Sequence, residues 1–140
     1  MRCVALGIAL ACAGGLSVLQ GQEPAERGIY TPAQAPRGKS LYLENCGACH
    51  GPDLSGSLIA PPLNRELFVG GRRSFSQLFE YTQLFMPVFS PNGLSRQQTV
   101  DILAYALQAR GFPAGSIELP AAAEDVAAVT LATAAAPSRR

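Results

Sequence analysis

The five residues Cys46-Gly47-Ala48-Cys49-His50 decide the interpretation of this 140-residue sequence. His50 is the only histidine in the chain, and two residues separate the two thiols. The remaining cysteines, Cys3 and Cys12, lie in an apolar segment at the start of the chain. Two cysteines so close together cannot cross-link a small domain, so the pair serves a purpose other than a disulfide framework.

This motif is the attachment signal of a c-type haem. The thiols of Cys46 and Cys49 would form thioethers with the two vinyl groups on one edge of the porphyrin. His50 follows at once and would place its imidazole under the iron. We therefore predict one covalently bound haem c, with its iron, as the cofactor.

Two other chemistries use cysteines at this spacing. A thioredoxin-like dithiol belongs to a βαβ unit, and the sequence has no strand pattern of any length. A zinc site needs four ligands, whereas Cys46, Cys49 and His50 supply three in one short run. A thiol–disulfide oxidoreductase is therefore the least favoured interpretation.

The second axial ligand of the iron is predicted by elimination to be Met86. A single histidine cannot supply two ligands, and Met1 belongs to the leading segment. Met86 lies beside Pro87 in an irregular stretch rather than on a helix face. Methionine also fills gaps in apolar cores, and Lys39 could bind iron only when deprotonated. An iron with an open sixth position, as in a gas sensor or a peroxidase-like protein, is the main alternative.

The ends of the chain differ in composition from its middle. Residues 1–21 have the basic start, apolar run and polar boundary of a signal peptide, with an uncleaved anchor as the alternative. We predict a leader over residues 22–35, one domain over 36–119 and an alanine-rich mobile tail over 120–140. The predicted location is periplasmic or otherwise exported, with membrane contact only through such an anchor.

Helical signals dominate the predicted domain, so the fold class is all-α. One helix is expected from Pro36 to the cysteine pair, and a second over residues 74–84. Ser95 and Gln98 form a capping box for the last helix, which Gly111 ends. Its buried face is expected to contain Val100, Leu103, Ala104 and Leu107. The apolar wall of the site is expected to contain Leu54, Leu63, Phe68, Phe75, Leu78, Phe79 and Leu103.

Charge excludes some functions. The chain has 11 Lys and Arg residues and 10 Asp and Glu residues, for a formal net charge of +1. No basic run is present that could follow a nucleic-acid backbone or mark a membrane surface.

From about Pro36 to Gly115 the chain resembles the class I cytochrome c family. The resemblance is carried by Cys46-Gly47-Ala48-Cys49-His50-Gly51, Pro61-Pro62-Leu63, Met86-Pro87 and Ala104-Tyr105. It implies three or more helices wrapped around one covalently attached haem, with the first and last helices crossing at Gly38, Tyr42 and Tyr105. It also implies that the carbonyl of Pro61 holds the axial imidazole.

A finer likeness is to monohaem cytochromes that accompany periplasmic quinoprotein dehydrogenases. It is carried by Met86-Pro87, Asn92-Gly93-Leu94-Ser95, Ala104-Tyr105 and Gly111-Phe112-Pro113-Ala114-Gly115. Val88 departs from these relatives, in which a second proline often follows the methionine–proline pair directly. The expected function is single-haem electron transfer between redox partner proteins, on the dehydrogenase or terminal oxidase side. We expect no enzymatic activity.

Overall fold

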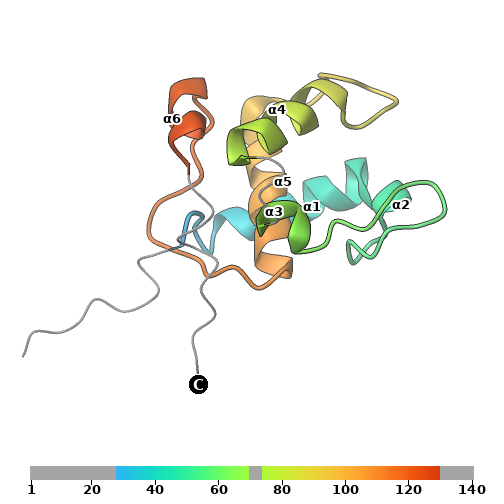
Figure 1. The fold of residues 1–140 in the computed structure, drawn as a ribbon, viewed down its shortest axis with the longest axis horizontal. Coiled ribbons are helices and arrows are strands. Elements are labelled where there is room, and N and C mark those ends of the chain that lie inside the picture. The colour runs from blue at the N-terminus through green and yellow to red at the C-terminus, as the bar shows by residue number, and fades with distance from the viewer. Residues whose placement is uncertain (1–27, 70–73, 130–140) are drawn as a thin grey trace, which may run out of the picture.

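The computed structural model describes residues 28–69 and 74–129, which form six helices (Figure 1). No strand occurs among these residues, which confirms the all-α prediction for this part of the chain. No helix in the same ranges is long and apolar enough to cross a membrane. The predicted signal peptide, the start of the leader and residues 130–140 lie outside the described residues.

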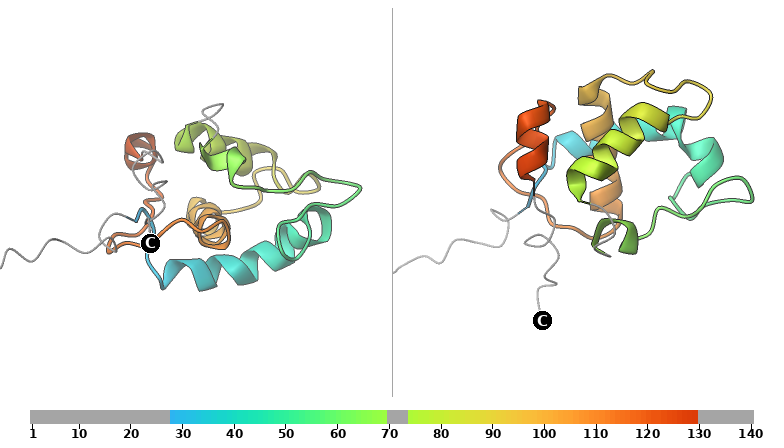
Figure 2. Two further views of the ribbon diagram at one scale, coloured as in Figure 1. Left: turned by 60° about the horizontal axis from the view of Figure 1, so that its bottom comes forward. Right: turned by 45° about the horizontal axis from the view of Figure 1, so that its top comes forward.

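The helices differ greatly in length. The long ones are α1 (Gln34–Asn45), α4 (Phe75–Phe85) and α5 (Arg96–Ala109). The short ones are α2 (Gly47–His50), α3 (Glu66–Val69) and α6 (Ala123–Ala128). Helix α2 and the loop after α4 lie at one end of the molecule, whereas α6 lies at the other (Figures 1 and 2).

Helices α1 and α5 pack directly against each other. The buried Gly38 allows the close approach, because a Cβ there would meet the carbonyl oxygen of Asp101 at 1.7 Å. The ring centroids of Tyr42 and Tyr105 lie 5.3 Å apart across the same contact. The crossing implied by the family resemblance is therefore present. Helix α1 begins two residues before Pro36, whose missing N–H needs no partner in a first turn.

Capping residues fix where α4 and α5 begin. Ser95 accepts a hydrogen bond from the Gln98 backbone N–H, and Gln98 bonds back, as the sequence predicts. Ser74 and Gln77 form the same reciprocal pair at α4, a signal that our sequence analysis did not use. All four residues expected on the inner face of α5 are buried. Of the seven residues expected in the apolar wall, six are buried and Leu63 is half-buried.

Two segments outside the predicted domain limits of 36 and 119 also pack into the core. Tyr30 is 1% exposed, and its hydroxyl donates to the Phe112 carbonyl at 2.7 Å. Val126 of α6 is 2% exposed, and α6 packs against α4. The packed region therefore includes described parts of both the expected leader and the expected tail.

Candidate functional site

His50 lies at the end of α2, with its Nδ1 atom 2.8 Å from the carbonyl oxygen of Pro61. A carbonyl oxygen can only accept a hydrogen bond, so Nδ1 carries the proton in this contact. In the neutral ring the lone pair is then on Nε2, the atom available to a metal. The structure thus contains the His50–Pro61 contact that the resemblance implied, and the role of the two residues toward a cofactor stays a prediction.

The two cysteines lie on one helical turn. Cys46 ends α1, donating its backbone N–H to the Tyr42 carbonyl at 2.8 Å, and its own carbonyl accepts from the His50 N–H at 2.9 Å. Cys49 is three residues further on, so the two side chains share a face of the turn. Its carbonyl accepts a hydrogen bond from the Ser57 hydroxyl at 2.5 Å. Both thiols are free and half-buried, which suits attachment to one edge of a ligand.

Burial affects the chemistry of the dithiol. The pKa of Cys46 is raised to about 11, mainly by desolvation and then by the charge of Cys49. At neutral pH the Cys46 thiol is therefore protonated in the chain without cofactor. Thiol–disulfide exchange needs a thiolate with a lowered pKa, so this environment is the opposite of the one that a redox-active dithiol requires.

The loop after His50 turns sharply and is tied to the motif. Gly51 and Gly56 have φ values of +80° and +81°, which favour glycine, and Leu54 has a φ of +66° despite its side chain. The Tyr42 hydroxyl donates to the Gly51 carbonyl at 2.6 Å. The Gly56 N–H donates to the His50 carbonyl at 2.7 Å. These bonds give the loop a defined path from the histidine toward Pro61.

Met86 ends α4, and its backbone N–H donates to the Thr82 carbonyl at 3.0 Å. Its side chain is half-buried, and the following peptide bond, to Pro87, is cis. The residue therefore lies at the start of a loop rather than on the buried face of a helix, as the sequence predicts. Its role as a ligand stays a prediction.

Gln83, which was not among the predicted site residues, anchors the Met86 loop. Its side-chain amide donates to the Leu94 carbonyl at 2.5 Å, and its amide oxygen accepts from the Thr99 hydroxyl at 2.9 Å. Gln83 thus connects the far end of the loop to α5. The signal for it was a polar residue within the apolar stripe of α4, where a buried amide requires partners.

The available donor atoms fit a c-type haem. Two unlinked thiols share a turn, and an imidazole has one nitrogen bound to a carbonyl and the other available. The loop that carries Met86 lies at the same end of the molecule as α2 (Figures 1 and 2). No group of three or more His, Cys, Asp or Glu residues within 28–69 and 74–129 could hold a metal ion instead.

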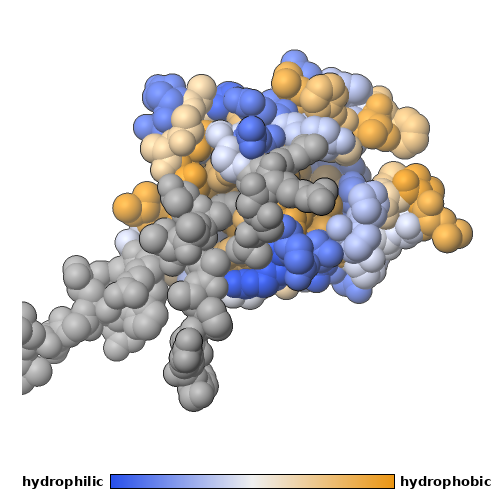
Figure 3. All heavy atoms as spheres, in the orientation of Figure 1, coloured by the Kyte–Doolittle hydropathy of each residue, from blue (hydrophilic) through white to orange (hydrophobic). Residues whose placement is uncertain are grey.

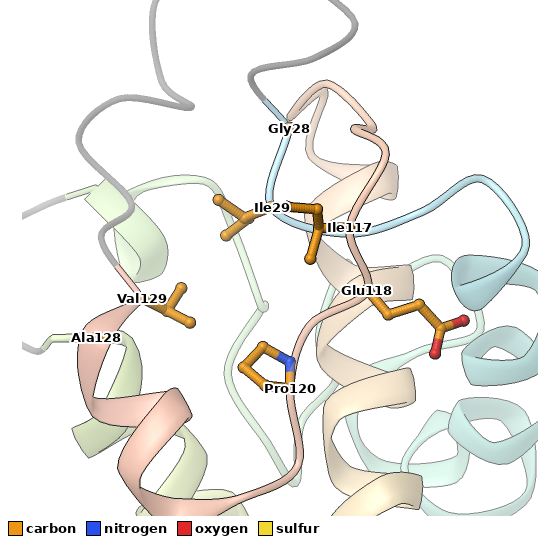
Figure 4. A pocket seen from close by; sticks show the side chains of 7 residues that line it. All are labelled: Gly28, Ile29, Ile117, Glu118, Pro120, Ala128 and Val129. Carbon is orange, nitrogen blue, oxygen red and sulfur yellow. The ribbon is translucent and has the colours of Figure 1, made fainter.

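An open pocket of about 330 Å³ (Figure 4) lies beside α6, at the end of the molecule away from α2 (Figure 1). Its lining residues are Gly28, Ile29, Ile117, Glu118, Pro120, Ala128 and Val129. The lining has one ionisable side chain, Glu118, whose carboxylate points away from the pocket (Figure 4) and accepts from Arg37 at 2.8 Å. This pocket therefore offers no chemistry comparable to that around His50.

Comparisons with known proteins agree with this geometry. Residues 33–105 match the family model described as cytochrome c oxidase, cbb3-type, subunit III. The chain is also similar to a solved structure, the sulfane dehydrogenase SoxCD from Paracoccus pantotrophus. That match has a TM-score of 0.55 and 22% identity and covers 89% of this chain and 70% of the other. No curated protein matches this sequence.

Proposed function

We propose that this chain carries one electron at a time between redox partner proteins. It belongs to the family described as cytochrome c oxidase, cbb3-type, subunit III. It is a class I c-type cytochrome with covalently bound haem c. In this proposal Cys46 and Cys49 hold the haem through thioethers, while His50 and Met86 are the axial ligands. The haem supplies an iron that alternates between ferric and ferrous states.

The observation that carries the proposal is the 2.8 Å contact between His50 Nδ1 and the Pro61 carbonyl. This contact fixes the tautomer and the orientation of the ring, and it increases the electron donation of Nε2. A histidine that had no ligand to bind would gain little from such a constraint. The thioether of Met86 favours ferrous iron and raises the reduction potential, which suits an electron carrier.

We propose that electrons enter and leave at the end of the molecule that holds residues 54–64, which include Pro61, and residues 81–95, which include Met86. We call these two segments the ligand loops. Residues 54–64 and 81–95 contain no charged residue, and their exposed side chains include those of Ile59 and Phe89, at 78% and 90% exposure. Apolar side chains gather over both loops in Figure 3. Exposed apolar patches commonly mark protein contacts, so a partner would dock here through apolar contacts rather than through ion pairs.

The finer role that we propose is transfer from a dehydrogenase toward a terminal oxidase in the periplasm or another exported compartment. The matched family is named for an oxidase subunit, and the matched structure is a dehydrogenase. The basic and apolar start of the chain favours export, with a cleaved signal peptide or an anchor at residues 1–21.

Optical spectra of the protein, produced with haem-maturation machinery, test this function. We expect a low-spin spectrum, the weak long-wavelength band of an iron–methionine bond when oxidised, and a sharp α-band when reduced. A high-spin spectrum that shifts with carbon monoxide would instead favour the gas-sensor or peroxidase-like alternative. Absence of haem absorbance would contradict both and return the interpretation to a bare dithiol.

A further inference from the structure

We propose that Arg110 is a positioning residue that holds the Pro61 carbonyl against His50, an inference that rests on the proposed role of His50. Arg110 lies at the end of α5, far in sequence from the motif. Its Nε donates to the Leu63 carbonyl at 2.6 Å, and its Nη2 donates to the Leu54 carbonyl at 2.8 Å. One guanidinium thus joins both sides of the loop that carries Pro61.

The loop has no helix or sheet ladder of its own, so a few backbone hydrogen bonds and the Arg110 guanidinium hold its base. The Leu63 N–H donates to the Leu54 carbonyl at 2.9 Å, which closes the loop at its base. Leu54 has a positive φ and is fully buried, so its conformation needs support from its surroundings. Hydrogen bonds from a charged donor are stronger than neutral ones. Arg110 donates such bonds to the base of the loop, and its Nη2 makes a longer one, of 3.4 Å, to the backbone carbonyl of Asp53.

The backbone of Arg110 is itself held firmly. Gly111 has a φ of +76°, and its N–H donates to the Gln108 carbonyl at 3.0 Å. The Phe112 N–H donates to the Leu107 carbonyl at 3.0 Å, so α5 ends in a Schellman motif. The Arg110 carbonyl also accepts from Arg65 at 2.7 Å. The guanidinium is therefore mounted on the same helix that packs across α1.

The consequence reaches His50 through two residues of backbone. Pro61 stands two positions before Leu63, so release of the Leu63 carbonyl would let the Pro61 carbonyl move away from Nδ1. A weaker bond at Nδ1 reduces the electron donation of the imidazole through Nε2. Weaker donation disfavours the ferric state, so we infer that loss of the Arg110 contacts raises the reduction potential.

The test is Arg110→Lys in the haem-loaded protein, because lysine keeps the positive charge and loses the planar fork. We expect a higher reduction potential and amide exchange about tenfold faster at Leu63 and Gly56, the factor of one lost charge-assisted hydrogen bond. Arg96→Lys is the matched control in the same helix. Arg96 donates to the Ala121 carbonyl at 2.5 Å and does not contact the loop, so both readouts should stay as in the unaltered protein.

A lower melting temperature of Arg110→Lys with an unchanged potential would show that Arg110 only stabilises the fold, and would overturn the inference. If the variant does not fold, hydrogen exchange of the Arg110 Nε–H is measured in the unaltered protein. Protection from exchange supports the bond to the Leu63 carbonyl, and free exchange with solvent overturns the inference. Lack of haem in the unaltered protein would instead overturn the proposed function.

Discussion

In the proposed function, a single side chain, that of Met86, decides whether the sixth position of the haem iron is closed or open. Met86 is half-buried at the end of α4, and Gln83 ties its loop to α5. The backbone around Met86 is therefore held by hydrogen bonds of the surrounding structure, independently of any ligand. This support matters because a flexible loop would let water or gases compete for the sixth position.

We expect Met86→Ala to convert the site to the open form. The variant should become high-spin, bind carbon monoxide when reduced and have a lower reduction potential, because a sulfur ligand that favours ferrous iron is lost. Optical spectra and a redox titration check this. Leu84→Ala is the matched control, since Leu84 is exposed and two residues away, and it should keep the low-spin spectrum. Retention of that spectrum by Met86→Ala would show that Met86 is not the ligand.

The buried Tyr42 should make the folded protein less stable at alkaline pH. Burial raises its pKa to about 12. Its contribution to stability is therefore complete below its ordinary pKa of about 10 and is lost as the pH rises through about 12. Tyr42→Phe should make the alkaline loss less steep, while the buried Tyr30, whose pKa is also raised by burial, keeps its own part. The variant should cost about 1–3 kcal/mol at neutral pH, because the Gly51 carbonyl loses its donor. Denaturant melts at several pH values check both effects, and an equally steep alkaline loss in the variant would contradict the assignment.

At the scale of elements, the close contact of α1 and α5 depends on Gly38. Gly38→Ala would place a Cβ 1.7 Å from the Asp101 carbonyl oxygen, so the helices must separate. We expect a loss of at least about 3 kcal/mol in the free energy of unfolding. Gly47→Ala is the matched control, because its Cβ would meet nothing closer than 3.6 Å, and it should change stability by about 0.5 kcal/mol or less. Equal melts for the two variants would contradict the model of the crossing.

Local signals made the main helices predictable from the sequence. Ser95, Gln98 and Gly111 set the ends of α5 through contacts within a few residues, and such contacts can be read directly from a sequence. The attachment motif is equally local, since Cys46 and His50 belong to one turn. These features needed no knowledge of the rest of the fold.

Long-range contacts were not predictable. Arg110 meets Leu54 across 56 positions of sequence, and Gln83 meets Thr99 across 16. Burial of Tyr30 and Val126 likewise depends on partners distant in the chain, and their own segments are polar or alanine-rich. The sequence therefore indicated which residues could bind the cofactor but not which residues hold those ligands in place.

At the scale of the whole molecule, the proposed exchange surface can be tested with two isoleucines. Ile59 and Ile117 are 78% and 76% exposed. Ile59 belongs to the loop after α2, whereas Ile117 lines the pocket beside α6, and α2 and α6 lie at opposite ends of the molecule (Figure 1). Ile59→Ser should slow electron self-exchange by about fivefold, which corresponds to about 1 kcal/mol of docking free energy. Ile117→Ser should leave the rate unchanged. NMR exchange between oxidised and reduced protein measures both variants.

Salt provides an independent check on the same surface. Ion pairs are screened as ionic strength rises, whereas apolar contacts are not. Because the two ligand loops carry no charge, the self-exchange rate of the unaltered protein should change little with added salt. A steep decrease, or equal effects of the two serine variants, would place the exchange surface elsewhere.

Gly28 and Val129 line the same pocket, so the two ends of the described chain are neighbours. The Gly115 N–H also donates to the Tyr30 carbonyl at 2.7 Å, which fastens the segments that lead to these ends. Both ends lie away from the ligand loops (Figures 1 and 2). Attachment of the cytochrome through either of these segments, whether to a lipid, another protein or an electrode, would leave the proposed electron-exchange surface facing away from the attachment point.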